Sequence, residues 1–159
     1  MSATATMMPT RGYPLDSSAW LAHLFGEPGA DEVTTLLARS DIEVAISVLS
    51  ITEVYSRLCA IGRQREWTEL WSTYGLLFTA VIPADEKVAH RAIELHHASP
   101  ERLPTVDGLI AATASLHGRV LVHRDPHLSR IPKRLLFACA TLRNATSERR
   151  HGHGSSPRA

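Results

Sequence analysis

Residues 103–126 read LPTVDGLIAATASLHGRVLVHRDP, and this stretch decides the fold class of the chain. Its first part predicts a helix of small residues, built around AATA and ending at Gly118. Its second part, RVLVH, predicts a short apolar strand that breaks at the turn-forming pair Asp125–Pro126. A helix that leads directly into such a strand is typical of α/β proteins with a parallel sheet.

The same alternation of strands and helices extends toward the N-terminus. We expect strands near residues 12–15, 44–47, 79–83 and 119–123, with a less certain last strand within 134–142. Helical periodicity is found around 18–25, 30–39, 54–61, 67–74, 85–97 and 109–116. The predicted fold is therefore an α/β sandwich with a mainly parallel central sheet flanked by helices.

The length and composition fit one globular domain. The chain has 159 residues, of which 44% are hydrophobic and 21% are charged, so it can bury a core. We expect a domain over residues 12–142, a flexible N-terminal arm over 1–11 and a disordered tail over 143–159, where apolar residues are scarce. The 17 basic and 16 acidic residues nearly cancel, which excludes a protein that coats nucleic acid with positive charge.

Targeting signals and cysteine pairs are missing from the sequence. No apolar run approaches the roughly 20 residues that span a bilayer, and the N-terminus has no secretory h-region. Cys59 and Cys139 lie far apart in apolar runs, which predicts burial and argues against a disulfide scaffold. We therefore expect a cytoplasmic protein with no membrane contact.

Four acids occur at strand ends or at a helix start. Asp16 closes YPLD, Glu53 follows AISVLSIT, and Asp125 closes RVLVHRD. Asp107 opens the small-residue helix. In a parallel sheet these positions converge on one edge, where carboxylate oxygens suit a hard divalent cation such as Mg²⁺, with Mn²⁺ as a substitute.

Each acid also has a purely structural interpretation. Asp16 fits the N-cap of a helix, and Glu53 fits a capping box with Ser50. Asp107 fits a first-turn acid that complements the helix dipole, and Asp125 fits a turn. Taken singly, none of these positions indicates a metal site.

Together the motifs resemble a known family. PLDSSAWL, ISVLSITEVYSRL, LPTVDGLIAATA and VLVHRDPHL are similar, in order and spacing, to the four acidic motifs of PIN domains, most closely those of VapC-type toxins. The resemblance extends from Tyr13 to about Ile131, and DGLIAATA followed by a strand and a second Asp is its most specific part. It implies a three-layer sandwich with a catalytic metal centre.

The resemblance assigns roles to residues of this chain. The positions of the family's metal-binding, catalytic acids are taken, in motif order, by Asp16, Glu53, Asp107 and Asp125. Ser17 or Ser18 corresponds to the small hydroxyl residue that helps to orient the acids. Arg124 is a candidate for holding the substrate's phosphate backbone.

Two positions depart from the family pattern. His123 stands where members usually carry Thr or Ser, and Leu128 stands where an aromatic is common. The first change either weakens a hydrogen bond behind the metal or supplies a group that contacts phosphate or donates a proton.

The function implied is a metal-dependent endoribonuclease that hydrolyses RNA with a metal-activated water. As a VapC-like toxin it would be neutralised by a cognate VapB-like antitoxin and would form a homodimer. Two alternatives stay open: a PIN-fold housekeeping nuclease, and a non-catalytic module that binds RNA or protein. A receiver domain is disfavoured because Asp16 is followed by Ser17 and not by a second acid.

Overall fold

The computed structural model describes residues 11–133 and 138–142. The strands are β1 (Gly12–Leu15), β2 (Glu43–Ser47), β3 (Ala80–Ile82), β4 (Val120–His123) and β5 (Ala138–Thr141). The helices are α1 (Ser17–Phe25), α2 (Ala30–Leu37), α3 (Val48–Ala60), α4 (Trp67–Leu77), α5 (Glu86–Ala98) and α6 (Thr105–Leu116), with short 3₁₀ turns at Gln64–Glu66 and Leu128–Arg130. The expected arm, apart from Arg11, and the expected tail lie outside the described residues, as does 134–137.

The central sheet has five strands in the order β3-β2-β1-β4-β5, and every pairing between them is parallel. The chain first builds the sheet from β1 outward to β3 and then crosses to the other side of β1 to add β4 and β5. The strand order therefore reverses between β1 and β4, and crevices for ligands form at such a switch point. A receiver domain has the order 2-1-3-4-5, so the receiver interpretation is wrong.

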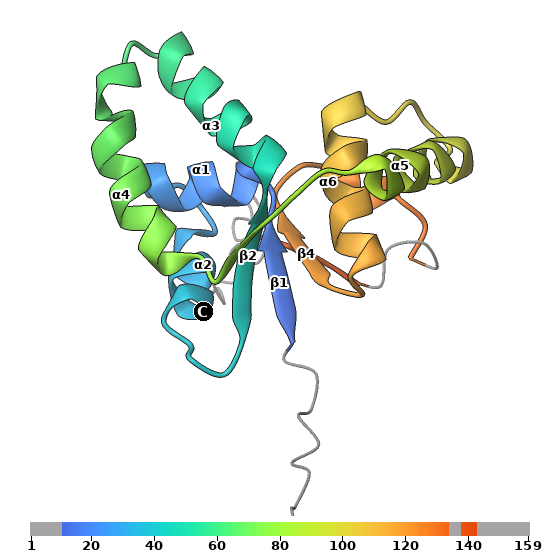
Figure 1. The fold of residues 1–159 in the computed structure, drawn as a ribbon, viewed down its shortest axis with the longest axis horizontal. Coiled ribbons are helices and arrows are strands. Elements are labelled where there is room, and N and C mark those ends of the chain that lie inside the picture. The colour runs from blue at the N-terminus through green and yellow to red at the C-terminus, as the bar shows by residue number, and fades with distance from the viewer. Residues whose placement is uncertain (1–10, 134–137, 143–159) are drawn as a thin grey trace, which may run out of the picture.

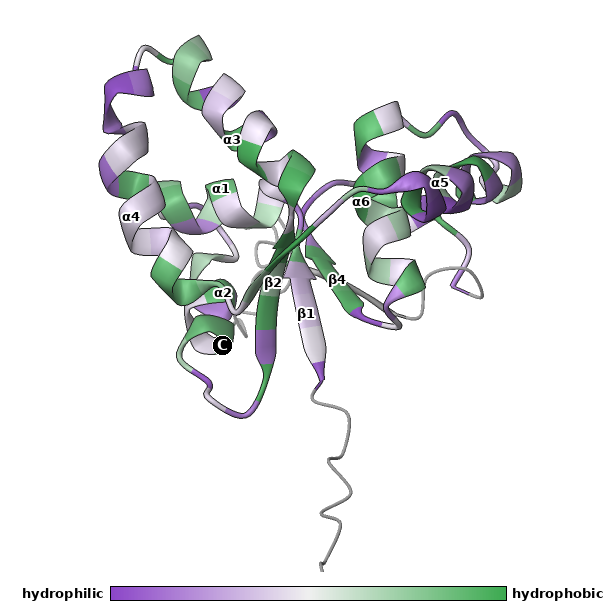
Figure 2. Ribbon diagram, viewed as in Figure 1, coloured by the Kyte–Doolittle hydropathy of each residue, from purple (hydrophilic) through white to green (hydrophobic). Residues whose placement is uncertain are grey.

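Helices cover both faces of this sheet. Figure 1 shows α1, α2, α3 and α4 on one side of the strands and α5 and α6 on the other. Each side has its own apolar core, one centred on Trp20 and Ile46 and the other on Ile110 and Leu121. Figure 2 shows β2 and β4 as mainly hydrophobic, whereas much of α5 is hydrophilic. The predicted three-layer sandwich is confirmed.

An aromatic cluster fills the core beneath α1 and α4. Trp20 is fully buried, and its ring centroid lies 5.1–6.3 Å from those of four aromatic residues: Trp67, Trp71, Tyr74 and Phe78. Trp67 and Trp71 stack nearly in parallel on the surface side of this cluster. The helical repeat of aromatics in α4 thus serves packing, as its spacing indicates.

Small residues allow α6 to sit deep between the sheet and α5. Ala111, Ala112, Thr113 and Ala114 are all fully buried, and short side chains let neighbouring elements approach closely. The helix therefore packs closely against both α5 and β4.

Two other expectations can be compared with the structure. Cys59 is exposed on α3, so the burial predicted from its apolar neighbours is wrong, because its position faces away from the core. Among the described helices, none has the length and apolar character needed to cross a membrane.

Candidate functional site

Asp16 lies directly after β1, next to the switch point. It is the N-cap of α1, and its Oδ2 accepts hydrogen bonds from the Ser18 backbone N–H at 3.0 Å and the Ser18 hydroxyl at 2.5 Å. The residue is 2% exposed, and its second oxygen, Oδ1, is buried with no hydrogen-bond partner. The capping interpretation is thus correct but accounts for only one of the two oxygens.

Glu53 is oriented by a residue from another helix. The Ser17 hydroxyl at the start of α1 donates a 2.6 Å hydrogen bond to Glu53 Oε2 on α3. The expected capping box with Ser50 is wrong, because α3 begins at Val48 and Ser47 caps it through the backbone N–H of Leu49. Glu53 therefore lies beyond the first turn, where its side chain can reach toward α1.

Asp107 lies in the first turn of α6 and is half-buried. Burial raises the pKa of Asp107 to about 6, and the negative charges of Asp125, Asp16 and Glu53 add to this effect. Charge effects of this kind weaken rapidly with distance. Asp16, Glu53, Asp107 and Asp125 are therefore near enough to one another for their charges to interact.

The pKa values of Asp16 and Glu53 are raised as well. Burial raises the pKa of Asp16 against the opposing hydrogen bonds from Ser18, and Asp125 raises it further. Burial also raises the pKa of Glu53, and the charges of Asp16 and Asp125 contribute. Carboxyl groups that raise one another's pKa are held together against their repulsion, and a bound cation relieves that repulsion.

His127 joins this cluster from the turn after β4. Asp125 Oδ1 accepts a 2.8 Å hydrogen bond from the His127 backbone N–H and lies 2.9 Å from the imidazole Nδ1. Asp107, Asp125 and His127 each offer one ligand atom, and these atoms lie within 4.8 Å of one another. Sequence reasoning missed His127, although the Asp-Pro-His spacing across a turn was a usable signal.

A hydrogen bond and an ion pair next to the acids connect the α1 region to Arg124, which follows β4. The Ser18 hydroxyl accepts a 2.9 Å hydrogen bond from the Arg124 backbone N–H, so Ser18 links Arg124 to Asp16. The Arg124 guanidinium forms an ion pair with Glu27, at the end of α1. Its positive charge is therefore shared with a carboxylate outside the acidic cluster.

His123 is fully buried at the end of β4. Burial lowers the pKa of His123, and the nearby charge of Asp16 opposes this effect. A ring without solvent exposure makes no contact with a substrate phosphate in this conformation. Of the two roles considered for His123, its burial beside Asp16 favours a place behind the acidic residues.

The donor set fits a divalent cation. Asp16 Oδ1 is a buried acceptor that no protein group satisfies, and leaving such a group unpaired is unfavourable. Ligand atoms of Asp107 and Asp125 lie close enough to share one ion, and a hard cation prefers oxygen ligands. The group of ligand atoms within 4.8 Å of one another in the described residues does not include Asp16 or Glu53, although their charges act on Asp107.

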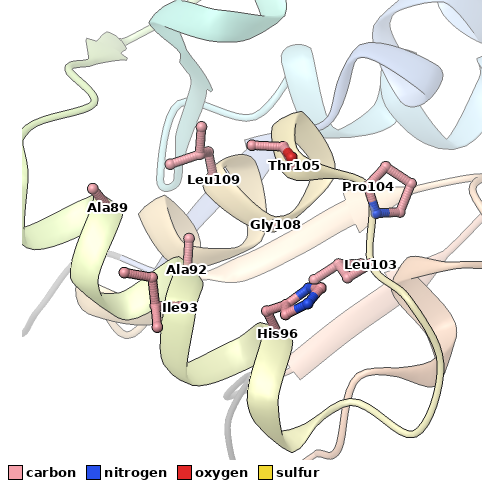
Figure 3. Close-up of a pocket in the computed structure, with 9 residues that line it drawn as sticks. All are labelled: Ala89, Ala92, Ile93, His96, Leu103, Pro104, Thr105, Gly108 and Leu109. Atoms are coloured by element: carbon pink, nitrogen blue, oxygen red, sulfur yellow. The ribbon is translucent and has the colours of Figure 1, made fainter.

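An apolar hollow of about 470 Å³ lies between α5 and α6 (Figure 3). Its walls are formed mainly by Ala89, Ala92, Ile93, Leu103 and Leu109, with a single imidazole from His96. None of the four acids lines it. Its lining offers no pair of groups for acid–base or metal chemistry, so the acidic cluster is the stronger candidate site.

Comparison with known proteins supports the same assignment of fold. The PIN domain family model matches residues 13–134. VapBC2 from Rickettsia felis, bound to a DNA fragment from its promoter, is 18% identical with a TM-score of 0.64, over 84% of this chain and 98% of that one. A toxin–antitoxin complex from Klebsiella pneumoniae is 20% identical with a TM-score of 0.62, over 83% and 98% of the two chains.

A third similar structure has a stated substrate. VapC20 from Mycobacterium tuberculosis, described as a toxin that cleaves the sarcin–ricin loop, is 16% identical with a TM-score of 0.59, over 74% of this chain and 92% of that one. No curated protein sequence matches this chain significantly. At these identities the similar structures show a shared fold.

Proposed function

The chain belongs to the PIN domain family, and we propose that it is a metal-dependent endoribonuclease, the toxin component of a VapBC-like toxin–antitoxin pair. One observation carries the proposal: ligand atoms of Asp107 and Asp125 lie within 4.8 Å of each other, and the charges of Glu53 and of Asp16, whose Oδ1 is buried without a donor, act on Asp107. Carboxylates held close together repel one another and make the folded state less stable. In a nuclease that binds a cation, the same carboxylates serve as its ligands.

The proposed ligands of the cation are Asp16, Glu53, Asp107 and Asp125, with Mg²⁺ as the cofactor and Mn²⁺ as a substitute. When bound, such a cation activates water and neutralises the charge that develops on the reacting phosphate. The protein fixes the orientation of the carboxylates. Ser18 orients Asp16, and Ser17 orients Glu53. Burial around Asp16 excludes water, which strengthens electrostatic interactions in the site.

RNA as the substrate and an antitoxin as the partner are supported by the solved structures that share the fold. They include toxin–antitoxin complexes and a toxin described as cleaving the sarcin–ricin loop. We propose that residues 12–142 form the nuclease domain and that the protein acts in the cytoplasm as a homodimer bound by a VapB-like antitoxin. Arg124 is the proposed contact to the RNA backbone, in exchange for its ion pair with Glu27.

Expression in bacterial cells tests the proposal directly. Induction of the wild type should arrest growth and produce new RNA 5′ ends, which sequencing would identify together with the target. Asp107→Asn should abolish both effects. Asp31→Asn, at an exposed acid on α2, is the matched control and should behave as the wild type. If the wild type is harmless and purified protein releases no RNA fragments with Mn²⁺, the toxin assignment is wrong.

His123 favours one alternative, a non-catalytic PIN module. A buried imidazole replaces the small hydroxyl residue of the family pattern, which removes a potential hydrogen bond behind the metal. Calorimetric titration separates the two cases. A protein that binds neither Mg²⁺ nor Mn²⁺ would be a binding module, whereas RNA cleavage without growth arrest would indicate a housekeeping nuclease.

A further inference from the structure

The imidazole of His127 lies at the acidic cluster, although the resemblance assigns a role only to the acid of the fourth motif and none to His127. A ligand atom of His127 lies within 4.8 Å of ligand atoms of both Asp107 and Asp125. Two atoms that bind one cation at about 2.1 Å each are separated by up to roughly 4.2 Å. Small side-chain rotations would therefore bring all three onto a single ion.

The turn holds His127 in place for this role. Its backbone N–H donates to Asp125 Oδ1 at 2.8 Å, so the residue cannot move far from that carboxylate while the turn is intact. The side chain of His127 is half exposed, which leaves the ring free to rotate. In the neutral ring one nitrogen carries a proton and the other a lone pair, so a hydrogen bond to Asp125 still leaves one nitrogen for a cation.

A second observation also points to a cation at this edge of the sheet. Asp16 Oδ1 is buried without a partner, and the charge of Asp16 acts on the pKa of Asp107. A cation between Asp107 and Asp125 would therefore also reduce the electrostatic cost of the buried Asp16. His127 is the histidine in the group of candidate ligand atoms that the described residues form with Asp107 and Asp125.

We propose that His127 is a ligand of the cation held by Asp107 and Asp125, and that its nitrogen shifts the preference of the site from Mg²⁺ toward Mn²⁺. Mg²⁺ is a hard cation that takes oxygen ligands, whereas Mn²⁺ is a first-row transition metal that also accepts nitrogen, although less strongly than the later members of that row. The inference rests on the proposed metal-dependent function and specifies which cation that function uses.

Titration calorimetry on the full-length, tag-free protein measures this preference. Mn²⁺ and Mg²⁺ are titrated separately into the wild type and into His127→Gln, which replaces the ligating ring nitrogen with an amide oxygen. We expect the affinity for Mn²⁺ to fall by at least about tenfold, while that for Mg²⁺ changes much less. His117→Gln, at an exposed histidine after α6, is the matched control and should leave both affinities unchanged.

Pulsed electron paramagnetic resonance of the Mn²⁺-loaded protein gives a second measurement. A hyperfine coupling to nitrogen should be present in the wild type and in His117→Gln and absent in His127→Gln. If the wild type binds both cations but shows no nitrogen coupling, or if His127→Gln leaves the ratio of the two affinities unchanged, the role of His127 is refuted and the nuclease proposal stands. If the wild type binds neither cation, the proposed function fails as well.

Discussion

The hydroxyl of Ser17 donates a 2.6 Å hydrogen bond to Glu53 Oε2, which joins α1 to α3 across 36 positions of the chain. Ser17 follows β1 by two residues, and Glu53 lies in the helix that follows β2, so the bond connects neighbouring βα units. Its charge-assisted character favours the ionised carboxylate and lowers the pKa of Glu53 against the effect of burial. It sets the orientation of the carboxylate that belongs to the second acidic motif.

We predict that Ser17→Ala weakens binding of Mg²⁺ by about tenfold, because a hydrogen bond to a charged group contributes roughly 1.5–3 kcal/mol. The protein should remain folded, since Ser17 is not part of the core. Titration calorimetry and circular dichroism check the two statements. Ser72→Ala is the control, because that hydroxyl bonds only to Thr68 O of its own helix. Equal affinities in both variants would contradict the role of Ser17.

Removing one charge from the cluster should stabilise the metal-free protein. Asp107→Asn relieves the repulsion that contributes to the raised pKa of Asp107, so we expect its Tm near neutral pH to rise by about 2–4 °C. RNA cleavage should be lost in the same variant. Thermal unfolding with EDTA measures the shift, and Asp31→Asn, at a first-turn acid outside the cluster, should not raise the Tm. A lower Tm for Asp107→Asn would show that the carboxylate has a structural role.

The stability of the metal-free protein should fall as the pH rises through the range in which Asp107 ionises. The folded-state pKa of Asp107 is about 6, above its ordinary value of 3.8, so the folded state keeps a proton that the unfolded state has released. Stability is therefore lost between those two values and changes little above the higher one. Saturating Mg²⁺ should reverse the trend, because the cation binds the ionised carboxylates.

Thermal unfolding measured from about pH 4 to about pH 8, with EDTA and with Mg²⁺, tests whether stability falls as the pH rises. Asp107→Asn should flatten the pH dependence measured with EDTA. Parallel curves with and without Mg²⁺ would show that the cation does not bind at the carboxylates.

The aromatic cluster should dominate the stability of the layer beneath α1 and α4. Trp20→Ala removes a fully buried side chain in contact with several rings, and such truncations cost about 3–5 kcal/mol. Trp71→Ala, at a partly buried position, should cost less. Urea denaturation of both variants measures the difference. If both lose the same free energy, the core is not centred on Trp20.

The order of the elements could be predicted from the sequence because its signals are local. Alternating apolar runs, the glycine after AATA and the Asp85 cap each depend on a few neighbouring residues, and the structure confirms them at β1, α5 and α6. The start of α3 was predicted less well. Both Ser47 and Ser50 can cap a helix, and only the packing of β2 shows that Ser47 does so.

The sequence by itself determined a parallel α/β architecture and the acids of four motifs, because periodicity and residue type do not depend on distant contacts. Only the tertiary structure decided the reversal of strand order between β1 and β4, the Ser17–Glu53 hydrogen bond, the burial of His123 and the place of His127 beside Asp107. Each of these depends on which segments pack together and how far a side chain is removed from water. Those quantities are set by long-range contacts, which no local pattern contains.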